Sequence, residues 1–301
     1  MKDIIIIGGG PGGMTAAIYA QRAGCDISLF EYMSPGGQVM TTPEIENYPG
    51  FVGAGFDLSM KFYEQVSALG VEFCYENVKS LRKEDGVFYV TCESGAEYSA
   101  KSVIIASGAR RRKLEIPGEL TFTGRGVSYC ATCDGNFFRN KTVAVVGGGN
   151  TAVEDAIYLS KLCKKVYLVH RRDSFRASKT LTDRLGGCEN IELVLNTVPV
   201  EIKGGDKVEG FVVRNKLTEE ESVIETDGVF VAVGTIPETS FVPEEVQLNE
   251  GGYIVTDNKC MTTMEGLFAV GDVRNTPLKQ VITAAADGAV AASYAAEYIG
   301  G

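Results

Sequence analysis

The sequence has few of the features that indicate a membrane, nucleic-acid or zinc protein. No apolar run approaches the roughly eighteen residues that a membrane helix needs. Basic side chains are in deficit, with 29 Lys and Arg against 39 Asp and Glu, and the net charge is -10. Nucleic acids and anionic membranes call for a basic surface, so small molecules or a protein partner are favoured. The single histidine leaves few ligands for zinc.

The length, the N-terminus and the cysteines set further expectations. A chain of 301 residues suggests two domains, at roughly 150 residues each. The opening "MKDIIIIGGG" has an apolar run of only four isoleucines before the glycines, so we expect a strand there and no leader. The eight cysteines are then expected to stay reduced, apart from any catalytic pair. This predicts a cytoplasmic protein.

Glycine is abundant, with 36 residues, and it marks two copies of one pattern. Residues 3–31 and 142–170 each read as apolar strand, glycine-rich turn, Ala-rich helix and second apolar strand. The turns carry the fingerprint of nucleotide-binding folds, at Gly8, Gly10 and Gly13 in the first copy and at Gly147, Gly149 and Ala152 in the second. In such a turn the backbone approaches a pyrophosphate closely, and the helix N-terminus offers it free N–H groups. We therefore predict two nucleotide sites.

The end of the second strand distinguishes the two sites. Glu31 can accept hydrogen bonds from a ribose 2′-hydroxyl and repels a 2′-phosphate, which favours FAD or NAD. The second copy ends in "HRRDSFR", where Arg171, Arg172 and Arg176 can bind a 2′-phosphate and favour NADPH. A solvated basic loop is the alternative interpretation. His170 is interpreted as part of this strand end and nucleotide site, and not as a catalytic base.

The C-terminal segment predicts a discontinuous first domain. Residues 266–270 read as a strand, followed by Gly271 and Asp272 and an Ala-rich helix. Asp272 is predicted to hydrogen-bond the ribityl chain of a flavin, with an ordinary surface aspartate as the alternative. The FAD domain would then comprise residues 1–112 and 245–301, with an NADPH domain of residues 113–244 inserted. Two crossings between the domains make a hinge possible.

A second pair of similar segments, one in each domain, completes the predicted fold. Residues 103–109 and 228–237 read as buried strands that run into a glycine, Gly108 in the first, and each closes one nucleotide domain. The segments before them alternate apolar and polar residues with period two, which predicts antiparallel strands over each sheet. The predicted fold class is α/β, with two Rossmann-like three-layer (ββα) nucleotide-binding domains, the second inserted in the first.

"SYCATCDG" at 128–135 contains one CxxC pair, Cys130 and Cys133. Zinc would need further ligands, and the other six cysteines are isolated. A structural disulfide across two residues closes too short a loop to stabilise the chain much. A redox pair is favoured, because a CxxC at the start of a short helical turn can stabilise one thiolate. Asp134 can supply a proton when the disulfide opens, although a turn-forming aspartate is the alternative.

Several motifs together resemble the low-molecular-weight thioredoxin reductases of bacteria and archaea. They are the first glycine turn, "ENYPGF" (46–51), "CATCD" (130–134), "GGGNTA" (147–152), "HRRDSFRA" (170–177) and "GLFAVGD" (266–272). The resemblance covers essentially the whole chain. It implies a homodimer with noncovalent FAD, reduced by NADPH and passing electrons to thioredoxin through the cysteine pair. It also implies that one domain rotates on the other to present nicotinamide or disulfide to the flavin in turn.

The resemblance assigns roles to individual residues. Cys133 would face the flavin, Cys130 would attack the disulfide of the partner, and Asp134 would be the acid. Other positions would contact the cofactors: Gly37, Gln38, Asn47, Gly108, Gly271, Asp272, Lys279, Gln280 and Val281 for FAD, and Gly147, Gly149, Asn150, Thr151, His170 and the three arginines for NADPH. The sequence departs from the family pattern at Lys279 (usually Arg), Ala286 (usually Gly) and Glu238 (commonly Asn).

The acceptor and one basic cluster remain open at this point. A glutaredoxin-like protein or a peroxiredoxin subunit could replace thioredoxin as acceptor, and a nonenzymatic redox sensor is a third possibility. "ARRRK" at 109–113 is the one dense basic cluster. It can be interpreted as a patch that steers an acidic thioredoxin, or as a solvated linker.

Overall fold

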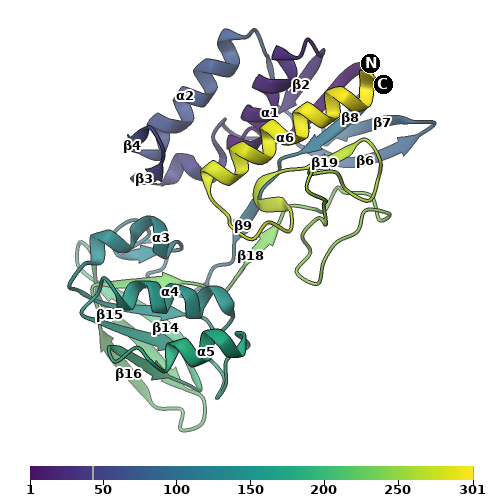
Figure 1. Ribbon diagram of the computed structural model, residues 1–301. Coiled ribbons are helices and arrows are strands. Elements are labelled where there is room, and N and C mark those ends of the chain that lie inside the picture. The colour runs from purple at the N-terminus through teal and green to yellow at the C-terminus, as the bar shows by residue number, and fades with distance from the viewer. Residues whose placement is uncertain (43, 301) are drawn as a thin grey trace. The chain divides into compact units, whose positions relative to one another are not determined.

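The computed structural model describes residues 1–42 and 44–300 and divides into two compact units. The first unit comprises Met1–Arg110 and Ile236–Gly301, and the second comprises Arg111–Thr235. The chain crosses between them at β9 (Ala109–Arg111) and β18 (Thr235–Pro237), which pair as a two-stranded sheet. Figure 1 shows both crossings. Within the described ranges, no helix is long and apolar enough to cross a membrane.

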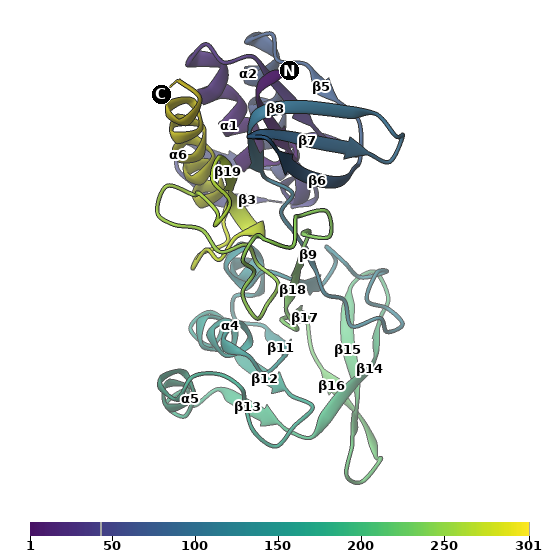
Figure 2. The same cartoon turned by 90° about the vertical axis from the view of Figure 1, so that its right-hand side faces the viewer.

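A seven-stranded sheet forms the centre of the first unit, in the order β5-β2-β1-β8-β7-β6 with β19 beside β8. Its strands are β1 (Lys2–Ile7), β2 (Ile27–Phe30), β5 (Phe73–Cys74), β6 (Val78–Glu84), β7 (Val87–Cys92), β8 (Glu97–Ile105) and β19 (Leu267–Ala269). Strands β1, β2, β5, β8 and β19 are parallel, whereas β6 and β7 add an antiparallel extension. Figure 2 shows β6, β7 and β8 side by side.

The isoleucines of β1 explain why this strand lies at the centre. Ile4 and Ile6 belong to the hydrophobic cluster on the helical face of the sheet, and Ile5 and Ile7 belong to the cluster on the other face. Because side chains alternate along a strand, a run of four isoleucines can be buried on both faces at once. Here all four are at most 5% exposed.

The helical face of this sheet carries α1 (Pro11–Arg22), α2 (Gly55–Ala68) and α6 (Val281–Gly300). Helices α1 and α6 pack side by side (Figure 1). A Cβ on Gly288 of α6 would lie 2.2 Å from the carbonyl oxygen of Gly12, so this crossing requires glycine. The remaining elements are the 3₁₀ turns η1 (Gly37–Thr41) and η3 (Gly271–Val273) and the hairpin β3 (Ile45–Tyr48) with β4 (Phe51–Gly53).

The second unit repeats this plan around a five-stranded parallel sheet of order β10-β17-β11-β12-β13. Its strands are β10 (Val127–Ser128), β11 (Thr142–Val146), β12 (Lys165–Val169), β13 (Ile191–Val194) and β17 (Gly228–Val231). One face packs on α4 (Asn150–Ser160) and α5 (Lys179–Leu185), while α3 (Ala131–Asp134) and η2 (Gly135–Phe138) pack nearby. The other face packs on an antiparallel sheet of β14 (Thr197–Gly204), β15 (Val208–Asn215) and β16 (Glu221–Glu225). The predicted α/β class with two Rossmann-like units is confirmed.

Candidate active site

The first glycine turn connects β1 to α1 and leaves open space where a phosphate would lie. Gly8 has φ +111°, and a Cβ there would lie 2.3 Å from the carbonyl oxygen of Ala106. A Cβ on Gly13 would lie 1.8 Å from the carbonyl oxygen of Gly8. Gly10, in contrast, has nothing within 4 Å of its Cβ position. Gly8 and Gly13 are therefore required because a side chain would clash with the backbone. Gly10 borders the space where a pyrophosphate could approach the start of α1.

Glu31 follows β2 and is held by backbone donors on both carboxylate oxygens. Oε2 accepts from the N–H of Gly9 at 2.8 Å, and Oε1 accepts from the N–H of Met33 at 2.8 Å. Each oxygen keeps a second lone pair. Glu31 is thus fixed beside the glycine turn as an acceptor that could bind ribose hydroxyl groups.

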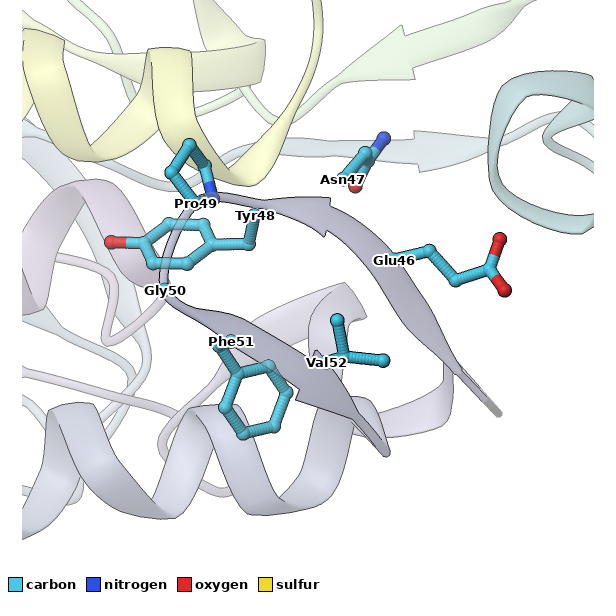
Figure 3. Close-up of a pocket in the computed structure, with 7 residues that line it drawn as sticks. All are labelled: Glu46, Asn47, Tyr48, Pro49, Gly50, Phe51 and Val52. Atoms are coloured by element: carbon cyan, nitrogen blue, oxygen red, sulfur yellow. The ribbon is translucent and has the colours of Figure 1, made fainter.

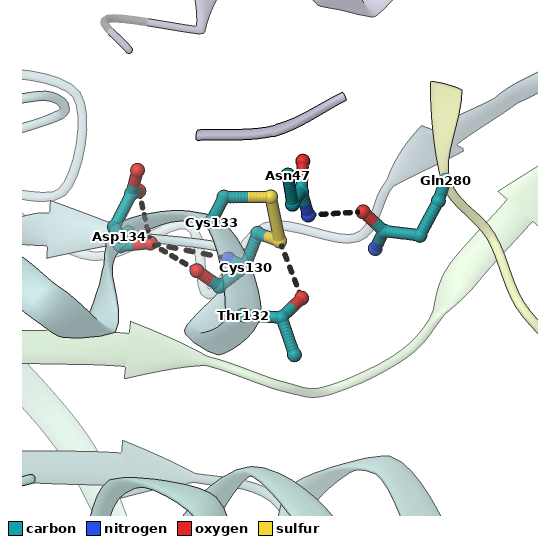
Figure 4. The surroundings of a disulfide bond; sticks show 7 residues. Asn47, Cys130, Thr132, Cys133, Asp134 and Gln280 are labelled. Atoms are coloured by element: carbon teal, nitrogen blue, oxygen red, sulfur yellow. Dashed lines mark hydrogen bonds between the residues drawn. A yellow bond between two sulfur atoms is a disulfide. The ribbon is translucent and has the colours of Figure 1, made fainter. Parts of the chain in front are cut away.

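Three of the predicted flavin contacts are hydrogen-bonded. Asn47 and Gln280 bond to each other, and Gln38 bonds to strand β9. The Asn47 amide donates to Oε1 of Gln280 at 3.0 Å, as Figure 4 shows, although 233 residues separate the two. The Gln38 amide donates to the carbonyl of Ala109. Asn47 also belongs to the β3–β4 hairpin, whose residues 46–52 line an open pocket (Figure 3). Gly37 opens η1 with φ +58°.

The C-terminal part of this site begins where β19 ends. Gly271 has φ +70° and donates its N–H to Oδ2 of Asp287 at 3.0 Å. Asp287 also pairs with the half-buried Arg274 at 2.7 Å, and sequence reasoning missed this pair. Asp272 lies in η3 and is partly exposed. This loop is therefore fixed by a charge pair before helix α6 begins.

The start of α6 carries the remaining predicted contacts. The N–H of Gln280 donates to Oγ1 of Thr283 at 3.1 Å, and Val281 is the first helical residue. The ammonium group of Lys279 lies 3.5 Å from the centroid of the Tyr253 ring. This cation–π contact ties Lys279, where the family pattern has arginine, to a residue that the sequence did not point to.

The second glycine turn connects β11 to α4 in the same way. A Cβ on Gly147 would lie 2.4 Å from the carbonyl oxygen of Ala232 and 2.6 Å from Cβ of Ala152, so this glycine makes room for the alanine. Gly149 again has nothing within 4 Å of its Cβ position. Asn150 and Thr151 begin α4 and are exposed, and Oδ1 of Asn150 accepts from the N–H of Ser178 at 2.9 Å.

The basic segment after β12 is tied to this turn. The N–H of Arg176 donates to the carbonyl of Gly148 at 2.7 Å, and the buried His170 ring fills the place where a Cβ of Gly148 would lie. Nε2 of His170 lies 3.1 Å from the carbonyl oxygen of Ser174, and burial lowers the pKa of the ring, which is therefore neutral at pH 7. The side chains of Arg171, Arg172 and Arg176 belong to exposed residues. Three cations thus lie on the loop that contacts the second glycine turn.

Cys130 and Cys133 form a disulfide at the start of α3, with 5.3 Å between their Cα atoms. Cys130 is the N-cap residue, and both cysteines are half-buried, so burial does not separate their roles. Sγ of Cys130 lies 3.4 Å from the hydroxyl of Thr132 (Figure 4). Over residues 1–42 and 44–300, no group of three or more His, Cys, Asp and Glu side chains could hold a metal ion.

Asp134 is connected to the cysteine pair through Ser128, a residue to which the sequence alone assigned no role. The Ser128 hydroxyl donates to Oδ2 of Asp134 at 2.6 Å and accepts from the N–H of Cys130 at 3.1 Å. Oδ1 of Asp134 is buried and has no hydrogen-bond partner among the described residues. Burial raises the pKa of Asp134, while the bond from Ser128 and the charge of Arg111 lower it. A carboxyl group that is easily protonated therefore lies one residue from the disulfide.

The chain is similar to known proteins along nearly its whole length. The family model "Pyridine nucleotide-disulphide oxidoreductase" matches residues 2–288. A thioredoxin reductase from Treponema pallidum (strain Nichols) is 44% identical over 299 residues, covering 99% of this chain and 97% of that protein. The crystal structure of thioredoxin reductase from Streptococcus pyogenes MGAS5005 has a TM-score of 0.93 at 44% identity, covering 100% of this chain and 98% of the other. A ferredoxin-flavin thioredoxin reductase from Clostridium acetobutylicum has a TM-score of 0.55 at 34% identity, covering 99% and 97%.

Proposed function

Because the chain belongs to the thioredoxin reductases of the pyridine nucleotide-disulphide oxidoreductase family, we propose that it reduces the disulfide of thioredoxin with electrons from NADPH. The observation that carries the proposal is the Cys130–Cys133 disulfide with Asp134 coupled to it through Ser128. A disulfide across two residues at a helix start is poorly suited to stabilise a fold and well suited to exchange.

The first unit has the features that FAD would need. Gly10 leaves room for a pyrophosphate at the start of α1, and the fixed carboxylate of Glu31 can accept from a ribose. Asn47 and Gln280, joined by their hydrogen bond, and Gln38 are the polar side chains that would border the isoalloxazine. Bound there, the flavin would accept a hydride from nicotinamide and deliver two electrons to the disulfide.

The second unit has the features that NADPH would need. Gly149 borders open space at the start of α4, and the loop with Arg171, Arg172 and Arg176 is tied to the same turn. Guanidinium groups bind phosphate oxygens in bidentate fashion, so this loop favours a 2′-phosphate. One solved relative is named for ferredoxin, so the family alone does not decide the electron donor. The glycine turn and the three cations favour a phosphorylated pyridine nucleotide here.

The chemistry of the chain itself is a dithiol–disulfide cycle. The Cys130–Cys133 bond takes up two electrons and two protons and becomes a dithiol. The Cys130 thiolate then attacks the disulfide of the partner, forming a mixed disulfide and releasing one partner thiolate, which takes a proton. Cys133 attacks Cys130, the second partner thiol leaves with the other proton, and the internal disulfide forms again. Asp134, with a raised pKa, is the group that holds and releases a proton at this site.

A change in the relative placement of the domains is part of the proposal. FAD would be bound by the first unit, which the sequence predicted as residues 1–112 and 245–301, whereas the cysteine pair belongs to the second unit, Arg111–Thr235, together with the nicotinamide site. One flavin cannot meet a nicotinamide and a disulfide on the same face at once. Gly108 and Gly234, one on each crossing, have positive φ and open space at their Cβ positions, which suits a hinge. A crosslink that locks the two domains should abolish turnover and leave the flavin bound, and full activity in the locked protein would refute the rotation.

We also propose that the protein is cytoplasmic, that it forms a homodimer and that thioredoxin is its acceptor. Light scattering on the purified protein would test the homodimer.

The decisive experiment is an anaerobic titration. NADPH should bleach the yellow protein, and oxidised thioredoxin should restore the colour. Cys133→Ser should keep the flavin and lose thioredoxin reduction. Activity with a glutaredoxin-like protein or a peroxiredoxin subunit, in place of thioredoxin, would show that another carrier is the acceptor. A colourless protein after reconstitution would contradict the scheme.

A further inference from the structure

A buried glutamate connects the segment after β9 to the residue that precedes the redox pair. Glu119 is 1% exposed, and its carboxylate accepts three hydrogen bonds. The N–H groups of Leu114 and Glu115 donate at 2.9 and 2.8 Å, and the hydroxyl of Tyr129 donates at 2.9 Å. A buried carboxylate is tolerated only with such partners, so this set of bonds fixes the side chain of Tyr129.

Tyr129 places a cation near the pair. It precedes Cys130 in the chain, and its ring packs on the hydrophobic cluster between the five-stranded sheet and β14–β16. The guanidinium carbon of Arg111 lies 5.7 Å from the centroid of this ring. This distance is within the range of a cation–π contact. Burial, followed by the bond to Glu119, raises the pKa of Tyr129 to about 12, so the phenol stays protonated and keeps donating.

The charge of Arg111 acts on the acids around the disulfide. It lowers the pKa of Asp134, and it partly offsets the burial and the Glu154 charge that raise the pKa of Asp155 to about 7. Helix α4 packs against α3, and the ring of its Tyr158 lies next to Gly135. The acids of this helix that interact are Asp155 and Glu154, and the charge of Arg111 also acts on Asp155. Arg111 is the cation that acts on both Asp134 and Asp155.

The basic cluster at 109–113 therefore has two separate parts. Nε of Arg110 pairs with Oε1 of Glu238 at 2.8 Å, inside the first unit. Arg111 belongs to the second unit and contacts Tyr129. Adjacent arginines of the same charge thus have different surroundings, which provides a matched control.

We propose that Arg111, held against Tyr129 by the Glu119 network, is a positioning residue that keeps a fixed positive charge beside the Cys130–Asp134 turn. The inference rests on the proposed function, since it gives Arg111 a task in that cycle. The charge favours the thiolate of the reduced pair and the carboxylate of Asp134. Tyr129 and Glu119 act by holding Arg111 in place.

The test measures thiol reactivity, which needs neither bound cofactor nor carrier. The purified protein, reduced with dithiothreitol and freed of reductant, is alkylated with iodoacetamide between pH 5 and 9, and modification of Cys130 and Cys133 is followed by mass spectrometry. Arg111→Met should raise the apparent pKa of the more reactive thiol by about half a unit to one unit, which lowers its alkylation rate at pH 7 roughly three- to tenfold. Arg111→Lys keeps the charge and should restore most of the rate. Tyr129→Phe should shift the profile in the same direction by less.

The control is Arg110→Met, which should leave the alkylation profile where it is. An unchanged profile in Arg111→Met would overturn the inference, and so would an equal fall in rate at every pH, because that is the result expected from a structural defect alone. If the wild-type protein fails to reduce thioredoxin while the profile shifts as expected, the proposed function fails and the electrostatic role stands.

Discussion

Removal of the Ser128 hydroxyl offers the most direct test of Asp134 as the proton source. Ser128→Ala deletes the donor that lies 2.6 Å from Oδ2 of Asp134 and leaves the other oxygen as it is, buried and without a described partner. A hydrogen bond to a charged group contributes about 1.5–3 kcal/mol. Since one pKa unit corresponds to about 1.36 kcal/mol, the pKa of Asp134 should rise by about one to two units.

The direction of the kinetic effect follows from the role of the acid. A proton donor is active in its protonated form, so the rate of disulfide reduction should fall as the pH rises through the pKa of Asp134. Ser128→Ala should move this decline toward alkaline pH by one unit or more. The folding stability of the variant should also depend more strongly on pH. The folded pKa then exceeds the unfolded value by more, so the variant should lose more stability at pH 8 than near pH 2, where the carboxyl is protonated in both states.

The assay is a single turnover in which NADPH reduces the flavin and then the Cys130–Cys133 disulfide, followed by stopped-flow absorbance from pH 5 to 9. Ser102→Ala is the matched control, because Ser102 is also buried and donates to the carbonyl of Gly266 at 2.7 Å, in the first unit. It should cost stability and leave the pH profile in place. Asp134→Asn should remove the decline and slow the step by roughly 10²–10⁴-fold. If Ser128→Ala leaves the decline at the wild-type pH, Asp134 is not the donor.

Three other outcomes are expected. Gly10→Val should fold, because the Cβ position is open, but should lose bound flavin; a normal ratio of absorbance at 450 nm to protein would place the pyrophosphate elsewhere. Arg171→Ala combined with Arg172→Ala should raise KM for NADPH about 10-fold to 10³-fold and leave KM for NADH nearly unchanged; equal effects on both would contradict a 2′-phosphate site. Gly288→Ala should lower the free energy of unfolding by about 1–3 kcal/mol, since its Cβ would meet the Gly12 carbonyl at 2.2 Å, and a chemical melt with an unaltered midpoint would refute the tight crossing.

The fold was predictable because its main signals are local and periodic. The Ile4–Ile7 run, the glycine turn and the acid at the end of the second strand each act within 30 residues, and the internal copy repeats them. Burial on both sheet faces and the required glycines follow from these positions directly. The strand order was not predicted. The predicted antiparallel strands are present, but they extend the sheet of the first unit and form a separate sheet only in the second.

The partners of the site residues were harder to predict, because loops bring them together from distant segments. Asn47 meets Gln280, and Arg274 meets Asp287 across the turn before α6. Neither pair has a periodic signal, and each depends on the path of a loop and on a side-chain rotamer. Ser128 could have been found, since a hydroxyl two residues before a CxxC can reach both the backbone of Cys130 and the acid after the second cysteine.

Two positions that depart from the family pattern, Ala286 and Glu238, lie in surroundings that tolerate the change of side chain. Ala286 is exposed on α6, where alanine is the better helix former. Glu238 pairs with Arg110, and because their side chains are 42% and 66% exposed the pair is worth at most about 1 kcal/mol. Its backbone matters more, since the Glu238 carbonyl accepts from the Ser107 hydroxyl at 2.8 Å and its N–H donates to the carbonyl of Gly108 at 3.1 Å. Any side chain keeps those bonds, so Glu238→Asn should leave the flavin content unchanged.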